Sequence, residues 1–217
     1  MDRRTMISAL ALVLGSSSVP FSLVQGGESQ TALQQLDKDF NIPAGKRLDL
    51  QLKTGGSVNI TGWAKDVISI RLNVSGRDWQ DCRFEANETP SGLSIISRYE
   101  GERKSYSTSL HFEIKVPKSL DIEIQSAGGE LRISDVTGDL RGKTMGGLLE
   151  LRNVGGKVDL TTMGGDVMLV NSEINGTVQT MGGRVLIKDV TGDIKGSSMG
   201  GEVKYINVTN LNGKTIR

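Results

Sequence analysis

The sequence predicts an all-β protein: a parallel β-solenoid (β-helix) with 18-residue coils, capped by an irregular N-terminal β region. Three observations support this fold class. Glycine pairs recur at a strict interval of 18 residues, an alternating apolar run follows each pair, and a turn signal ends most runs. A fixed short period is typical of solenoids, in which each coil packs against the next. The pairs stand at 128–129, 146–147, 164–165, 182–183 and 200–201.

The residues between glycine pairs predict two strands per coil. Val167 and Leu169 illustrate the first apolar run, whose alternation places side chains on one face of a strand. Asn175-Gly176 illustrates the turn signal, and 158–160 illustrates the second apolar run that leads to the next pair. A crossover helix needs a dozen or more residues, so it does not fit in this period. We therefore expect equivalent strands to stack in parallel, about 4.8 Å apart.

The second glycine of each pair is predicted to form a sharp corner. Such corners need positive φ or close backbone approach, and glycine meets both demands without steric cost. Neither GxxxxGK[ST] nor GxGxxG occurs here, which favours this structural role over phosphate binding. Replacing Gly147 or Gly165 with Val should therefore destabilise the protein. The expected corner residues are Gly129, Gly147, Gly165, Gly183 and Gly201.

The period divides the chain into four parts. Residues 126–217 are expected to form the regular coils, and 40–125 an N-terminal β region with a first coil and a cap. Within that region, 55–60 (GGSVNI) copies the opening of a coil, whereas 76–104 departs from the pattern. A cap is expected because a bare stack of strands would expose a sheet edge and the apolar core. Residues 28–39 are expected to be a linker, and 1–27 a signal peptide.

The first 27 residues have the layout of a secretory signal. Arg3 and Arg4 precede an apolar stretch over 6–14, which small residues follow. This stretch is too short for a membrane span. No clean A-x-A site appears, so cleavage anywhere from 18 to 27 fits, and retention of the segment as an anchor is the alternative. We expect an exported protein, periplasmic or at the cell surface, without a stable membrane span after signal removal.

Charge and cysteine content exclude some functions. The chain has 26 basic and 25 acidic residues, and removal of Asp2, Arg3 and Arg4 leaves a neutral protein. Neutrality argues against a nucleic-acid partner. Cys82 is the single cysteine, so no intramolecular disulfide can form, and a buried thiol is the favoured interpretation over an intermolecular bond or a reactive group.

Catalytic chemistry has little support in the sequence. His111 is the sole histidine and is expected to be a surface residue of a strand. A polysaccharide lyase or hydrolase would need carboxylates clustered on one sheet face, whereas isolated turn aspartates would favour a binding protein. We therefore expect no catalytic and no cofactor-binding residue. The aspartates to check are Asp135, Asp139, Asp159, Asp166, Asp189 and Asp193.

Calcium is the main alternative source of stability, because RTX β-rolls also have 18-residue coils. Their GGxGxDxUx motif requires glycine at the fourth place and aspartate at the sixth. The corresponding stretches here, such as GGDVML and GGRVLI, have neither. Zinc would need more histidine and cysteine ligands than the chain has. We expect no metal site and a protein that folds without metal.

Two stretches carry a resemblance to a known family. FNIPAGKRLDLQLKTGGSVNITGW over 40–63 and VPKSLDIEIQSAGGELRISDVTGDLRGKT over 116–144, with the coils that follow, resemble the bacterial DUF4097 putative adhesin family. The resemblance implies an exported or membrane-linked β-solenoid and supplies no catalytic residues. The chain departs from the family in placing Met-Gly where many relatives have small polar residues before the glycine.

A methionine precedes each of the last four glycine pairs. Val158, Leu160 and Thr162 share one parity, so the next residue, Met163, should point outward. Four such residues would span about 14 Å and form an apolar stripe that marks an interaction surface. The alternative is that the corner resets parity and buries them, so that exchange of Met163 and Met181 for Gln would be destabilising. The predicted stripe comprises Met145, Met163, Met181, Met199, Met168 and Leu186.

These observations favour a non-enzymatic exported β-solenoid, an adhesin-like binding or scaffold protein of the bacterial envelope or cell surface. Its partner is expected to be a protein or a glycan, and self-association through a solenoid face is also open. The alternatives are a polysaccharide-acting β-helix enzyme and a structural or regulatory envelope component.

Overall fold

The computed structural model describes residues 34–102 and 107–216, which contain 17 strands and one short 3-10 helix. The first strands are β1 Gln34–Phe40, β2 Arg47–Leu52, β3 Ser57–Trp63, β4 Ile68–Gly76, β5 Cys82–Thr89, β6 Gly92–Tyr99, β7 Thr108–Pro117 and β8 Asp121–Ser126, with helix η1 at Trp79–Asp81. The others are β9 Leu131–Ser134, β10 Thr137–Thr144, β11 Leu149–Arg152, β12 Gly155–Thr162, β13 Val167–Thr180, β14 Val185–Thr191, β15 Ile194–Ser198, β16 Val203–Thr209 and β17 Thr215–Ile216.

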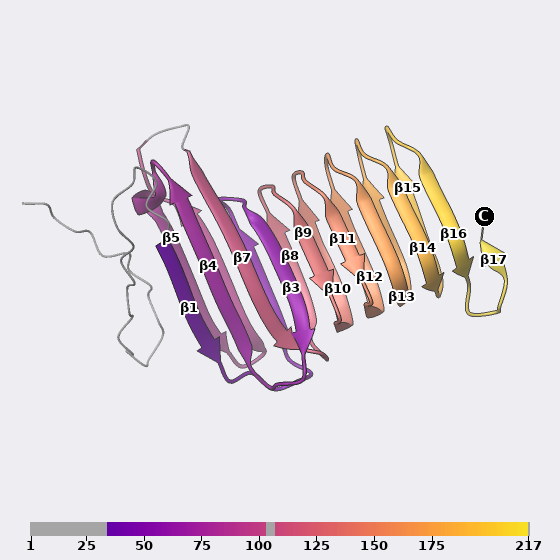
Figure 1. Cartoon of the computed structure of the whole chain (residues 1–217), viewed down its shortest axis with the longest axis horizontal. Helices are drawn as coiled ribbons and strands as arrows, with labels where there is room; N and C mark the ends of the chain where they lie inside the picture. The colour runs from indigo at the N-terminus through magenta and orange to yellow at the C-terminus, as the bar shows by residue number, and fades with distance from the viewer. Residues whose placement is uncertain (1–33, 103–106, 217) are drawn as a thin grey trace, which may run out of the picture.

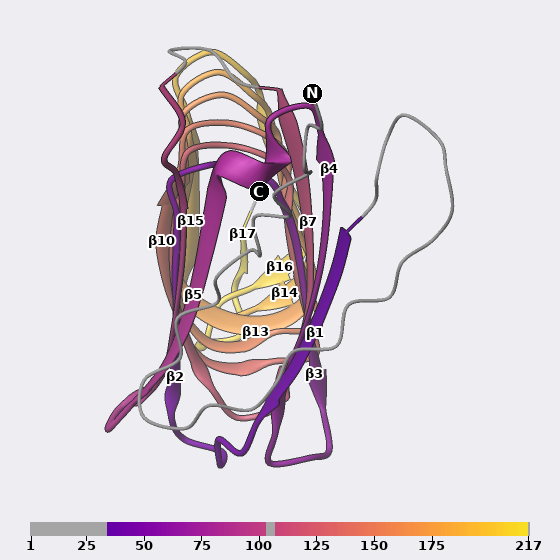
Figure 2. The same ribbon diagram turned by 90° about the vertical axis from the view of Figure 1, so that its left-hand side faces the viewer.

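All of these strands belong to one sheet that winds into a nearly closed tube around a core (Figures 1 and 2). The all-β class is confirmed, but the prediction of a parallel β-solenoid is wrong, because strand directions in the sheet are mixed. Strand β4 is antiparallel to both β1 and β7, β5 is antiparallel to β6, and β17 is antiparallel to β16. Alternating apolar residues predict a strand but not the direction of its neighbour, and a tight connection such as that between β5 and β6 forces antiparallel pairing.

The flattened tube has two walls. Wall A contains β5, β6, β2, β8, β10, β12, the end of β13 and β15, and wall B contains β1, β4, β7, β3, β9, β11, the start of β13, β14, β16 and β17. From β8 to β15 in wall A and from β9 to β16 in wall B, neighbouring strands are parallel and pair residues 18 positions apart. Leu140 faces Val158 in wall A, and Leu149 faces Val167 in wall B.

The core lies between the walls and follows from alternation along each strand. In β12, Val158, Leu160 and Thr162 are buried while the residues between them are not. The C-terminal layers are filled by Val, Ile and Leu. The N-terminal part adds aromatic packing, with Phe84 edge-on to Phe112 at a centroid separation of 6.2 Å.

Residues near both ends of the tube pack against its core. The predicted linker over 28–39 is wrong from residue 34 onward, because β1 pairs along β4 and places Phe40 in the core. At the other end Tyr205 packs against the core, and its hydroxyl accepts a hydrogen bond from the backbone of Gly196 at 2.8 Å. The predicted signal peptide lies outside the described residues. Within those residues, no helix has the length and apolar character needed to cross a membrane.

Candidate binding surface

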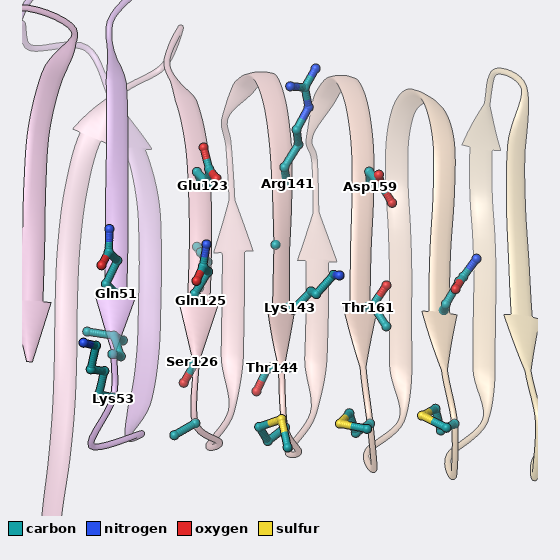
Figure 3. A pocket seen from close by; sticks show the side chains of 18 residues that line it. Gln51, Lys53, Glu123, Gln125, Ser126, Arg141, Lys143, Thr144, Asp159 and Thr161 are labelled. Carbon is teal, nitrogen blue, oxygen red and sulfur yellow. The ribbon is translucent and has the colours of Figure 1, made fainter. Parts of the chain in front are cut away.

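A groove of about 1060 Å³ runs across the outer surface of wall A (Figure 3). Outward-pointing side chains of β2, β8, β10, β12 and β13 line it, because their neighbours along each strand point into the core. The polar and charged lining residues are Gln51, Lys53, Glu123, Gln125, Ser126, Arg141, Lys143, Thr144, Asp159, Thr161 and Gln179.

Strand register arranges the lining in rows perpendicular to the strands. Gln51 faces Gln125, which faces Lys143, and Lys143 in turn faces Thr161. These four side chains lie at one level in Figure 3. The next row contains Glu123, Arg141 and Asp159, whose charges alternate in sign. Such a surface offers hydrogen bonds and mixed charges along a fixed line, which suits an extended polar partner.

A row of methionines borders the groove at the corner of wall A; Met145, Met163 and Met181 line it, and Met199 continues the row. All four side chains are exposed, whereas Thr144, Thr162 and Thr180, each directly before a methionine, are buried. The outward parity inferred from the sequence is thus the one observed. We call these four residues the Met row.

The other two members of the predicted stripe lie elsewhere. Met168 and Leu186 pair with each other in wall B and are half-buried. The sulfur of Met168 lies 3.9 Å from the guanidinium of Arg152 in the same wall. The corner after each glycine pair separates them from the Met row, because it reverses the chain from wall A to wall B. The structure therefore does not assemble the six residues into one stripe, and an interaction role for the Met row stays a prediction.

The second glycine of each pair has a specific steric role. Gly129 and Gly147 have φ of +102° and +87°, as predicted for corners. An added Cβ at either position would also lie within 2.2 Å of a carbonyl oxygen of a neighbouring strand connection, and at Gly165 this crowding alone applies, with the Cβ 1.9 Å from the carbonyl oxygen of Gly147. Gly183 and Gly201 are crowded in the same way, at 2.1 and 2.2 Å. The first glycine of the pair, as at Gly164, has room for a side chain.

Sequence reasoning missed a second series at the opposite corner. Five Asp and Asn residues spaced by 18 adopt the left-handed conformation, with φ between 51° and 60°. Asn and Asp tolerate this conformation better than other side-chain-bearing residues. Asn207 donates to Asp189 at 2.8 Å, and Asn153 donates to Asp135, which links successive coils. Their regular spacing could have identified them: Asp135, Asn153, Asn171, Asp189 and Asn207.

The aspartates that a polysaccharide-acting enzyme would have to cluster have separate partners. Asp139 pairs with Arg141 at 3.0 Å, and Asp159 accepts from Thr177 at 3.0 Å. The backbone N–H of Arg184 donates to Asp166 at 2.8 Å and holds the pKa of that carboxyl below its usual value, assisted by the Arg184 guanidinium. In the described part of the chain, no three His, Cys, Asp or Glu side chains form a group that could hold a metal ion.

His111 has a partner that the sequence did not reveal. Its Nδ1 lies 2.6 Å from the hydroxyl of Ser57, and its Nε2 lies 3.6 Å from a carboxylate oxygen of Glu113. These residues stand on wall B, across the core from the groove, and Glu113 follows His111 on the same strand. The serine is hydrogen-bonded, and none of these three residues lines the groove of wall A. Cys82 is buried, and burial raises the pKa of its thiol.

Comparisons with known proteins identify the fold but not a family. No protein-family model matches the sequence, and no curated protein does. The structure is similar to that of a putative cell adhesion protein from Clostridium sporogenes, with a TM-score of 0.52 and 10% identity over 79% of this chain and 99% of the other. A putative lipid binding protein from Parabacteroides distasonis matches 81% of this chain and 92% of its own, with 12% identity and a TM-score of only 0.28. At such identities the first similarity concerns the fold alone.

Proposed function

We propose that this protein is a non-enzymatic binding protein of the bacterial envelope that holds a partner protein in the groove of wall A. The proposal includes export, as the N-terminal sequence predicts, and membership of the DUF4097 putative adhesin family. The name of the Clostridium sporogenes protein, a putative cell adhesion protein, is in keeping with this role.

The groove beside the Met row is the observation that carries the proposal. Its lining is a ladder of Gln, Lys, Arg, Glu and Asp side chains on rigid, register-locked strands. None of its lining residues is aromatic, so the rings on which sugars commonly stack are not supplied here. The methionines beside the groove favour a protein as the partner, because their flexible side chains adapt to varied apolar contacts. We therefore favour a protein partner over a glycan.

Scattered carboxylates support binding over polysaccharide cleavage. Glycoside hydrolysis needs two carboxyl groups placed together on either side of one bond. In the groove, Glu123 and Asp159 are separated by the strand that carries Arg141, and Asp139 is paired with that arginine.

Site-specific crosslinking tests the proposal. A photoreactive residue at Thr161, in the groove, should capture one defined protein in cells that express the chain, and exchange of Lys143 for Glu should weaken that capture. The matched control is a photoreactive residue at Lys204, which is exposed on wall B. Equal capture from both positions, or no capture by a folded and exported protein, would contradict the assignment. Cell fractionation in the same experiment tests export.

A further inference from the structure

Exposure of the Met row is exceptional for this molecule. In the described ranges, five large hydrophobic side chains are exposed; four are the Met row and the fifth is Leu211. The exposed fractions are 62% for Met145, 45% for Met163, 44% for Met181 and 80% for Met199. Exposure is lower in the middle of the row than at its ends, which fits side chains that cover their neighbours. The two central side chains are thus the more shielded members of the row.

Hydrogen bonds fix the backbone beneath the row. The N–H of Met163 donates to the carbonyl of Thr144 at 3.0 Å, and the N–H of Met181 donates to that of Thr162 at 3.1 Å. Each methionine thus sits one strand spacing, about 4.8 Å, from the next. With a metal–sulfur bond of about 2.3 Å, the length known for zinc and thiolate, two sulfur ligands on opposite sides of one ion would be about 4.6 Å apart. Neighbouring thioethers can meet this geometry through their flexible side chains without moving the backbone.

The ligand type selects the ion. Thioether sulfur is a soft, neutral ligand that favours Cu(I) and needs no deprotonation. The row beside the methionines consists of Gln125, Lys143, Thr161 and Gln179, so it offers no carboxylate to Ca²⁺ or Mg²⁺. The chain lacks the RTX calcium motif and has one histidine and one cysteine, whereas a thioether site depends on none of these.

From this geometry we propose that the Met row binds Cu(I), with the central pair Met163 and Met181 as the principal ligands. Ag(I), which has similar ligand preferences and no redox chemistry under assay conditions, should bind at the same place. The site does not depend on the proposed protein partner. No bond to carbon and no electron transfer is involved, only coordination of a monovalent ion by thioethers.

Leucine substitution separates metal binding from apolar contact. The double variant Met163→Leu/Met181→Leu keeps the size and apolar character of the row but removes its sulfur ligands. Titration of the full chain with Ag(I), and with Cu(I) kept reduced against a competing chelator, should show affinity at least tenfold weaker for this variant. Met168→Leu is the matched control, since it removes a thioether from wall B, and it should bind as the parent protein does.

Methyl NMR supplies a readout specific to position. With ¹³C-methyl methionine, Ag(I) should shift the signals of Met163 and Met181 and leave that of Met168 unchanged. The proposal is overturned if the double Leu variant binds as tightly as the parent, if Met168 shifts as much as the row, or if binding leaves every methionine signal in place, as coordination by Cys82 or His111 would. The crosslinking experiment tests the protein partner separately. If the double Leu variant still crosslinks from Thr161, the proposed partner in the groove of wall A stands whether or not the Met row binds metal.

Discussion

The N-terminal part of the tube, β1 to β8, and the C-terminal part, β9 to β16, build the same two-walled cross-section by different means. In the N-terminal part, β4 runs antiparallel to both of its neighbours, and an aromatic pair packs among the aliphatic side chains of the core. In the C-terminal part, neighbouring strands of each wall are parallel and aliphatic side chains fill the core. A closed core therefore does not require uniform strand pairing, whereas rows of equivalent side chains on the surface do. The Met row begins only where the register becomes uniform, at β10, while the equivalent place after β8 holds Ala127.

The largest expected effect concerns the aromatic core of the N-terminal part. Phe112→Ala should lower the free energy of unfolding by about 3–5 kcal/mol, because Phe112 is buried and its edge-to-face contact with Phe84 is lost. Urea unfolding followed by circular dichroism measures the change. A loss of unfolding free energy below about 1 kcal/mol would show that the aromatic pair contributes little to the stability of the N-terminal part.

The next effect tests the corners of the C-terminal part. Gly165→Val should destabilise the protein by about 1–3 kcal/mol, since its Cβ would overlap the carbonyl of Gly147 and backbone must move. Gly164→Val is the matched control and should cost far less, because the nearest atom to its Cβ lies at 4.0 Å. Thermal melting of both variants measures the difference in destabilisation. Equal melting temperatures would show that the two glycine positions are equally tolerant of a side chain.

The opposite corner should be less sensitive. Asn171→Ala should cost about 1 kcal/mol, since alanine tolerates a φ of 51° less well than asparagine does. Asn171→Gly should cost less than Asn171→Ala, because glycine adopts this conformation freely. Denaturant unfolding of the pair tests the series. If alanine and glycine proved equivalent, the left-handed backbone would not be what selects Asn and Asp at this corner.

The smallest effect is a pH dependence at a contact between two coils. The pKa of Asp166 is lowered in the folded protein, so its contribution to stability is present above its unfolded value of about 3.9 and is lost as pH falls through the folded pKa. Asp166→Asn should therefore reduce the loss of stability on acidification below about pH 4. Melting temperatures of the parent protein and of Asp166→Asn at pH 3 and pH 7 measure this loss. Identical acid sensitivity of the two proteins would count against a stabilising contact between Asp166 and Arg184.

The sequence predicts which residues pair in the C-terminal part, but not which residues pair in the N-terminal part. The spacing of glycine pairs predicts which residues face each other from β10 onward, and the parity of Leu160 and Thr162 predicts the outward direction of Met163. Strand β1 pairs with β4 in antiparallel register, as at Leu36 and Leu72. The number of residues between two partners therefore changes along the strands. No period marks such contacts, and the polar residues between Leu36 and Phe40 resemble a linker.

The candidate site was predictable only in part, for a related reason. Periodicity predicts which residues are equivalent, but the groove draws Gln51 from β2 into the row of Gln125 and Lys143. The pairing of Gln51 with Gln125 lies in the N-terminal part, where the 18-residue spacing does not relate the paired strands. The contact between Ser57 and His111 likewise depends on the pairing of β3 with β7. Separation of Met168 from the Met row depends on the corner that sends the chain to the other wall.

The constant 18-residue pairing in the C-terminal part makes the length of wall A adjustable in discrete steps. Duplication of one unit, such as 155–172, would place each new residue opposite its equivalent and leave both ends of the tube unchanged. The groove and the Met row would each grow by one strand spacing of about 4.8 Å. Evolution can thus match the length of this surface to a longer or shorter partner by repeating or removing a unit that carries the same two kinds of corner.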